Sequence, residues 1–149
     1  MTTPQEEFRE ALLAVLGLPL GAAGYALAEL PVQWEGGLFR FRCRHDETLD
    51  RWVAYQLLAH PGYPSRFQVI LRRAALPGRV PTLEPVEITL PGLLWEGYGV
   101  RVLPAPDHWW AFSDQRTLGD GLLESGKLLV GYGLPWLDGS LVPGADAAG

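Results

Sequence analysis

The chain has 149 residues, of which 48% are hydrophobic and 19% charged, and its net charge is −5. This size and composition are typical of one domain with a single substantial core. No apolar run approaches the roughly 18 residues of a membrane-spanning helix, and the N-terminus lacks the basic and then apolar order of a secretory signal. The single cysteine excludes an intramolecular disulfide. We therefore expect a cytoplasmic protein without a membrane partner.

The first predicted element is an N-terminal helix. Thr3 is a favourable N-cap, Pro4 suits the first helical position, and Glu6 would complete a capping box three residues after Thr3. Apolar residues recur at helical spacing and form one stripe, namely Phe8, Ala11, Leu12, Val15 and Leu16. The segment 17–24, with three glycines and a proline, is expected to end this helix and to form a connector.

Residues 39–44 read FRFRCR, and this strict alternation predicts a strand whose two faces differ. One face would enter the core with Phe39, Phe41 and Cys43. The other face would present Arg40, Arg42 and Arg44. The preceding Gly36–Gly37 pair predicts a tight hairpin turn, and the segment around Val32 and Trp34 is the expected partner strand.

A second hairpin is predicted next, because segments 51–59 and 66–73 are rich in β-branched and aromatic residues and residues 60–65 in turn formers. A helix over 50–59 is the alternative, since the apolar spacing there also fits a period near 3.6. The proline-rich stretch 76–106 should hold only short or edge strands, around 86–90 and 100–103. Another strand is expected at 109–113, where Trp109 and Trp110 would point to opposite faces.

The last predicted element is a helix over 117–132, in which Leu118, Leu122, Leu129 and Tyr132 share one face. Its four glycines each cost roughly 1 kcal/mol relative to alanine, so the helix could be short or broken. We expect it to end at Gly133, with residues 134–137 as an apolar plug. Residues 1–139 would form one domain and residues 140–149 a disordered tail.

These elements predict an α+β fold, an antiparallel sheet of four to six strands with an N-terminal and a C-terminal helix packed on one face. The order of elements and the ending Leu134-Pro135-Trp136-Leu137 resemble a family of small bacterial α+β proteins catalogued as a domain of unknown function. The resemblance covers most of the chain. It implies the fold, and it transfers no functional residue.

Three patterns could indicate catalysis, and each has a simpler explanation. Residues 121–128 match a phosphate-binding loop until Leu128, which replaces the Ser or Thr that holds magnesium, so an amphipathic helix is the better interpretation. Cys43 and His45 share a strand face, but residues two apart lie roughly 6.6 Å from each other, too far for a thiol–imidazole pair. Several carboxylates could form a glycosidase pair by chance, namely Glu84, Glu87, Glu96, Asp107 and Asp114. The sequence predicts no catalytic residue, metal or cofactor.

Charge distribution points instead to binding. Residues 40–79 hold eight arginines and three acidic residues, a net charge of +5, whereas the rest of the chain carries −10. Six tryptophans add side chains that are favoured at binding surfaces. The candidate binding residues are Arg40, Arg42, Arg44, Arg66, Arg72 and Trp109.

The expected function is an interaction module that presents an arginine-rich sheet face to an acidic protein or an anionic ligand. Nucleic acid is an alternative ligand, because arginines at alternate strand positions match the spacing of backbone phosphates. An immunity-type inhibitor of a bacterial effector and a small hydrolase are further alternatives. An edge strand could also pair two copies into a homodimer.

Overall fold

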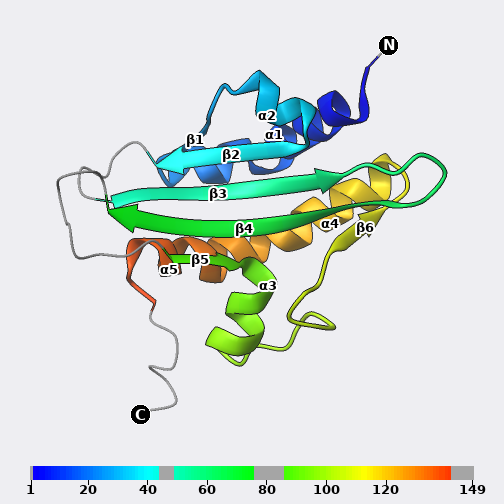
Figure 1. The fold of residues 1–149 in the computed structure, drawn as a ribbon. Coiled ribbons are helices and arrows are strands. Elements are labelled where there is room, and N and C mark those ends of the chain that lie inside the picture. Colours follow the sequence, from blue (N-terminus) through cyan, green and yellow to red (C-terminus); the bar gives the residue numbers. More distant parts are fainter. Residues whose placement is uncertain (1, 44–48, 76–85, 142–149) are drawn as a thin grey trace.

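The computed structural model describes residues 2–43, 49–75 and 86–141, which build a six-stranded antiparallel sheet accompanied by helices (Figure 1). The strands are β1 (Tyr25–Leu27), β2 (Leu38–Cys43), β3 (Leu49–Leu58), β4 (Ser65–Ala75), β5 (Val86–Thr89) and β6 (Trp110–Phe112). The helices are α1 (Pro4–Ala22), α2 (Pro31–Glu35), α3 (Leu90–Gly92), the π-helical turn η1 (Leu93–Gly97), α4 (Gln115–Leu128), the π-helical turn η2 (Leu129–Gly133) and α5 (Leu134–Asp138). The predicted α+β class is therefore confirmed.

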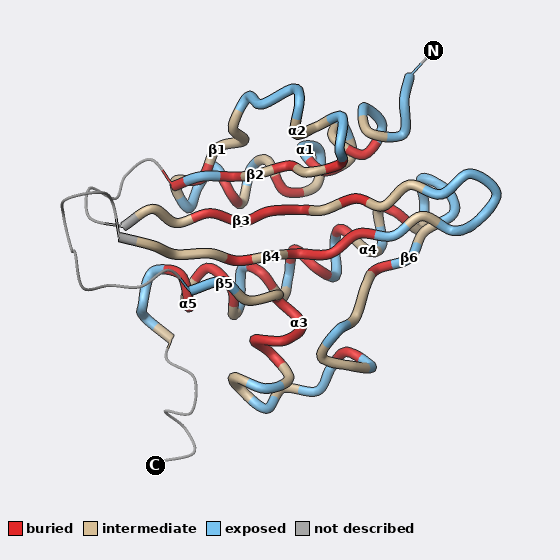
Figure 2. The backbone as a smooth tube through the Cα atoms, in the orientation of Figure 1, coloured by how far each residue is buried: buried red, intermediate tan, exposed pale blue. Residues whose placement is uncertain are grey.

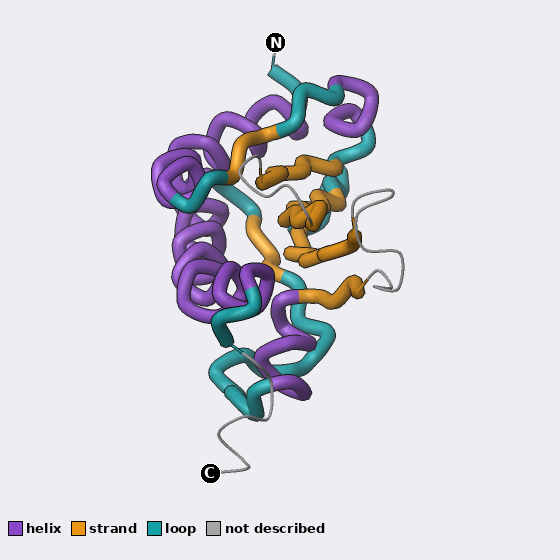
Figure 3. The backbone as a smooth tube through the Cα atoms, turned by 90° about the vertical axis from the view of Figure 1, so that its left-hand side faces the viewer, coloured by secondary structure: helices purple, strands orange, loops and turns teal. Residues whose placement is uncertain are grey.

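The strands follow the order β1-β2-β3-β4-β5. Strand β6 also pairs with β4, at residues 65–67, whereas β5 pairs with residues 70–73 of the same strand. The long helices gather on one side of the sheet, and no helix of the described part covers the opposite side (Figure 3). The core lies between these two layers, and burial is continuous along the middle of β3 and β4 (Figure 2). We call the side without helices the outer face.

The predicted N-cap of helix α1 is confirmed, because the Thr3 side chain accepts a hydrogen bond from the amide of Glu6 at 3.1 Å. It does not end at residue 17, so the predicted connector is wrong. The helix continues through Pro19 to Ala22. Although a proline within a helix removes a backbone hydrogen bond, Leu20 adds a further fully buried position to the apolar stripe. The free energy gained by burying this extra turn exceeds the cost of the backbone hydrogen bond lost at Pro19.

The predicted first hairpin is also wrong, since residues 31–35 form the short helix α2 and β2 pairs with β1 and β3 instead. Pro31 occupies the first turn of α2, where a missing amide proton costs nothing. The Trp34 ring stacks on Phe39 with 6.5 Å between centroids, so it joins the core from a helix. The alternation of β2 itself is confirmed, because Phe39, Phe41 and Cys43 are buried.

The second hairpin is confirmed as β3 and β4, with Tyr55 opposite Val69, and a helix over 50–59 is excluded. Strands β5 and β6 also lie where predicted. No strand forms at 100–103, however, because the Val100 amide donates to the Leu94 carbonyl and closes the turn after η1. Leu103 reaches the core from an irregular segment.

The C-terminal helix does not end at Gly133, because the backbone stays helical from α4 through η2 and α5 to Asp138. Gly139, with φ of +81°, takes the left-handed conformation that ends α5. The predicted apolar plug is nevertheless buried, with Leu134, Trp136 and Leu137 in the core. Of the predicted tail, residues 142–149 lie outside the described residues.

Candidate functional site

The candidate site is built from strand positions that point away from the helices. Because β2, β3 and β4 are in antiparallel register, Arg42, Trp52 and Arg72 lie side by side in one row across the outer face. Arg40 is two residues from Arg42 on β2, and Arg66 lies further along β4. The outer-face arginines therefore come from two strands, β2 and β4, and Trp52 of β3 lies between them.

Trp52 is the centre of this arrangement. The guanidinium carbon of Arg40 lies 4.4 Å from the centroid of the Trp52 ring, and that of Arg72 lies 5.9 Å from it. Trp52 is only 8% exposed although it stands on the helix-free side. Arginine stems commonly cover apolar surface in this way while their charged groups stay in water, and guanidinium–indole stacking adds a cation–π attraction.

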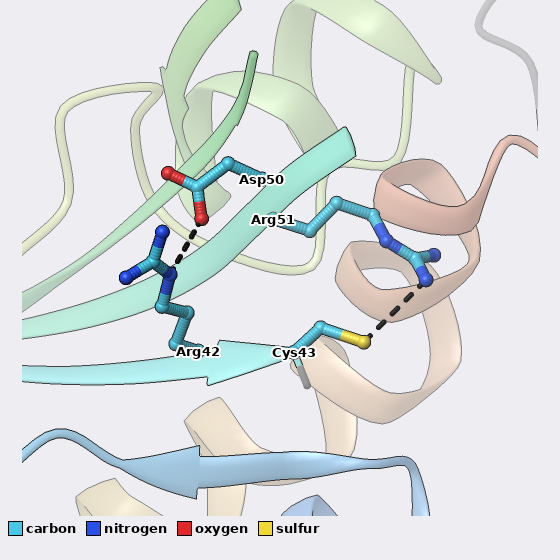
Figure 4. Close-up of polar contacts among 4 residues, drawn as sticks. All are labelled: Arg42, Cys43, Asp50 and Arg51. Carbon is cyan, nitrogen blue, oxygen red and sulfur yellow. Dashed lines mark hydrogen bonds and ion pairs between the residues drawn. The ribbon is translucent and has the colours of Figure 1, made fainter. Parts of the chain in front are cut away.

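Arg42 differs from its neighbours because its charge is compensated within the chain. Its Nε donates to Oδ1 of Asp50 at 2.7 Å, and the pair lies on the outer face (Figure 4). On the other side of the same strands, Nη2 of Arg51 donates to Sγ of Cys43 at 3.5 Å. Exposed ion pairs contribute only about 0–1 kcal/mol, so the Asp50 contact mainly reduces the charge that Arg42 offers to a ligand.

A second cluster contains Arg66 and Trp109, with the guanidinium carbon 4.9 Å from the ring centroid. Arg66 and Arg72 are six residues apart on β4, which corresponds to roughly 20 Å along an extended strand. Trp110 points inward and donates to the Glu124 carboxylate at 2.9 Å, whereas Trp109 is half-buried. The predicted site thus forms two separate groups, and Arg44 lies outside the described residues.

Stacking on arginine is common to most tryptophans of this protein. Five of the six tryptophans carry at least one guanidinium group over the ring, namely Trp34, Trp52, Trp95, Trp109 and Trp136. The prediction from sequence grouped Trp109 with the arginines but missed Trp52 as a site residue. The register of the second hairpin could have revealed it, since a turn at 60–65 places Trp52 opposite Arg72.

The alternative catalytic patterns find little support in the geometry. Cys43 is buried, and His45 lies outside the described residues. Residues 121–128 belong to helix α4 rather than to a loop that could surround a phosphate. Asp114 caps α4, and hydrogen bonds from Thr117 lower the pKa of its carboxyl group. Within the described ranges, no group of three or more His, Cys, Asp or Glu side chains could hold a metal ion.

In the part of the chain that the structure describes, no helix is long and apolar enough to cross a membrane. Comparison with protein-family models, with curated proteins and with solved structures finds no match to this chain. The resemblance to a small bacterial family therefore stays a prediction, and function must be argued from the residues.

Proposed function

We propose that this protein is an interaction module whose outer face binds an acidic segment of a partner protein. The observation that carries the proposal is the pairing of Arg40 and Arg72 on one indole without an ion pair. Among the described residues, the salt bridge of Arg42 with Asp50 is the only one, so no described carboxylate forms an ion pair with Arg40, Arg66 or Arg72. Glu87 on β5 is exposed and lies opposite Arg72 in the register of β4 and β5, without an ion pair to it among the described contacts.

Stacking prepares these arginines for carboxylates. A guanidinium group positioned next to an indole keeps its N–H donors available, and these can bind a carboxylate in bidentate fashion. The ring also restricts the long side chain before binding, which lowers the entropy lost in the complex. Two like charges on one indole repel each other, and an anion placed between Arg40 and Arg72 would relieve that repulsion.

The separation of the clusters favours a polypeptide over a small anion. A small anion could contact the group around Trp52 or the Arg66–Trp109 pair, whereas a six-residue extended segment spans the roughly 20 Å between them. Nucleic acid is less suitable, because the net charge of −5 would repel a long polyanion. Acidic segments with carboxylates at both ends match the surface best.

The test is titration calorimetry with a ten-residue peptide that carries acidic residues at both ends. Replacing Arg40 and Arg72 together with glutamine should weaken binding about tenfold or more at low salt. The matched control is Arg9→Gln, because Arg9 also stacks on a tryptophan, 4.6 Å from the Trp34 ring, but on the helix side. Equal affinity of the double variant and the wild type would refute the proposal.

A single-stranded oligonucleotide of equal charge distinguishes the alternative ligand. If the oligonucleotide binds more tightly than the peptide and the double variant loses it, the outer face reads a phosphate backbone instead. Tight binding of neither probe would leave the arginines with a structural role in covering Trp52.

A further inference from the structure

A groove of about 980 Å³ opens on the helix side of the molecule, at the end of the sheet where β3 turns into β4. Its walls are α1, the turn 60–65, and the junction 112–118 between β6 and α4, which meet at the right-hand end of Figure 1. Its apolar lining residues, which we call the floor, are Phe8, Ala11, Val15, Leu57, Phe112 and Leu118. Phe8, Leu57 and Leu118 are buried in the core, and Ala11, Val15 and Phe112 are half-buried. This groove is separate from the outer face.

Among the described residues, the charged side chains that line this floor are acidic, whereas the neighbouring Arg116, which acts electrostatically on Asp114, does not line the groove. Glu7 and Glu10 line the α1 wall, and Asp114 lines the opposite wall. Asp114 is held as a carboxylate by the hydrogen bonds from Thr117, which lower its pKa. In the part of the chain that the structure describes, no lysine or arginine lines the groove, and His60 is the one lining histidine.

We propose that this groove binds a cationic amphipathic segment of a partner protein. Apolar side chains of the segment would pack on Ala11, Val15 and Phe112, the half-buried part of the floor. Its lysines or arginines would face the carboxylates on both walls. Tyr63, which also lines the groove and is 77% exposed, offers an aromatic ring to one of these cations. The groove favours a cationic ligand, whereas the outer face favours an anionic one. The groove proposal therefore does not depend on the function proposed above.

The probe is a fluorescently labelled 18-residue peptide with leucine and lysine at helical spacing, about 27 Å long as a helix. Two further peptides serve as controls, one with glutamate in place of lysine and one with the leucine–lysine order scrambled. Fluorescence anisotropy should show binding of the first peptide only. Binding of the scrambled or the glutamate peptide with equal affinity would overturn the proposal, since charge complementarity and an apolar floor are both required.

Two protein variants locate the site. Replacing Glu7 and Glu10 together with glutamine should weaken binding about tenfold, whereas the matched change at the exposed Glu29 and Glu35 should alter it less than about twofold. Ala14→Trp, at an exposed lining position, should fill the groove and block the peptide while the thermal melt stays unchanged.

Full affinity of Ala14→Trp would overturn the proposal, as would equal effects of the two glutamine pairs. Light scattering tests whether a second copy of the chain occupies the groove instead. If the protein is a dimer at micromolar concentration and Ala14→Trp dissociates that dimer, a second copy of the chain occupies the groove. That result would refute the inference. The Arg40→Gln and Arg72→Gln double variant should bind the leucine–lysine peptide normally, which separates this groove from the outer face.

Discussion

Leu16 and Gly126 lie so close that a Cβ atom at position 126 would stand 2.5 Å from Cδ2 of Leu16. The contact joins the middle of α1 to α4, and both residues are buried. Glycine lowers the intrinsic stability of a helix, yet here it allows two helices to approach each other above the sheet. Gly126 is thus a packing position and not a helix break.

Gly126→Ala should reduce the free energy of unfolding by about 1–3 kcal/mol, because Leu16 is fully packed and cannot move aside. Gly119→Ala is the matched control in the same helix, since nothing lies within 4 Å of a Cβ atom there. That change should raise stability by up to about 1 kcal/mol through helix propensity. Urea denaturation of both variants measures the difference, and equal effects would contradict the packing argument.

The core contains a hydroxyl pair, with Tyr55 Oη and Ser125 Oγ 3.0 Å apart. Ser125 Oγ donates to the Leu122 carbonyl at 3.1 Å, so the tyrosine donates to the serine. Burial raises the pKa of the Tyr55 phenol, which keeps this donor protonated. Ser125→Ala should therefore cost about 1–3 kcal/mol, because it leaves a buried hydroxyl group without an acceptor.

Tyr55→Phe should cost less, about 1 kcal/mol, because Ser125 keeps its bond to Leu122. The double variant should cost less than the sum of the two single variants, since it removes both members of the pair. Thermal denaturation of the three variants completes this cycle. Additive losses would show that the two hydroxyl groups are not coupled.

Arg72 and Arg73 are neighbours on β4 that face opposite sides of the sheet. Nη1 of Arg73 donates to the Trp136 carbonyl at 2.9 Å, and its guanidinium carbon lies 4.3 Å from the Trp136 ring centroid. Arg73→Lys should lower stability by about 1–2 kcal/mol, because lysine cannot stack and donate in the same geometry. Arg72→Lys should change stability by less than about 0.5 kcal/mol but weaken binding of the acidic peptide. Equal melting temperatures of the Arg72→Lys and Arg73→Lys variants would refute the assignment of a structural role to Arg73 and a binding role to Arg72.

Partial burial lowers the pKa of His108 below its ordinary 6.5, although the charges of Glu124 and Asp107 oppose the shift. The unfolded chain therefore binds this proton more readily than the folded one. The stability linked to His108 is present above pH 6.5 and is lost as the pH falls through the folded pKa. NMR titration of the His108 ring should give a midpoint below 6.5, and His108→Asn should remove part of the acid destabilisation. A midpoint at or above 6.5 would exclude this linkage.

Local patterns in the sequence determined the two-faced strand β2, the β3–β4 hairpin, the start of α1 and the burial of the C-terminal plug. Each of these depends on residue spacing over a few positions, so it can be recognised without knowing what packs against it. Arg40 and Arg42 lie on the expected strand face because the same alternation sets both faces of β2.

Only the tertiary structure decided how far the helices run and which side chains meet. Helix α1 continues past Pro19, and α5 follows Gly133, because burial of Leu20, Trp136 and Leu137 outweighs local helix-breaking preferences. The stacking of Arg40 and Arg72 on Trp52 depends on strand register, a relationship between residues up to 32 positions apart. The sequence therefore supplied the arginines, and the pairing of β2, β3 and β4 brought two of them to the same indole ring.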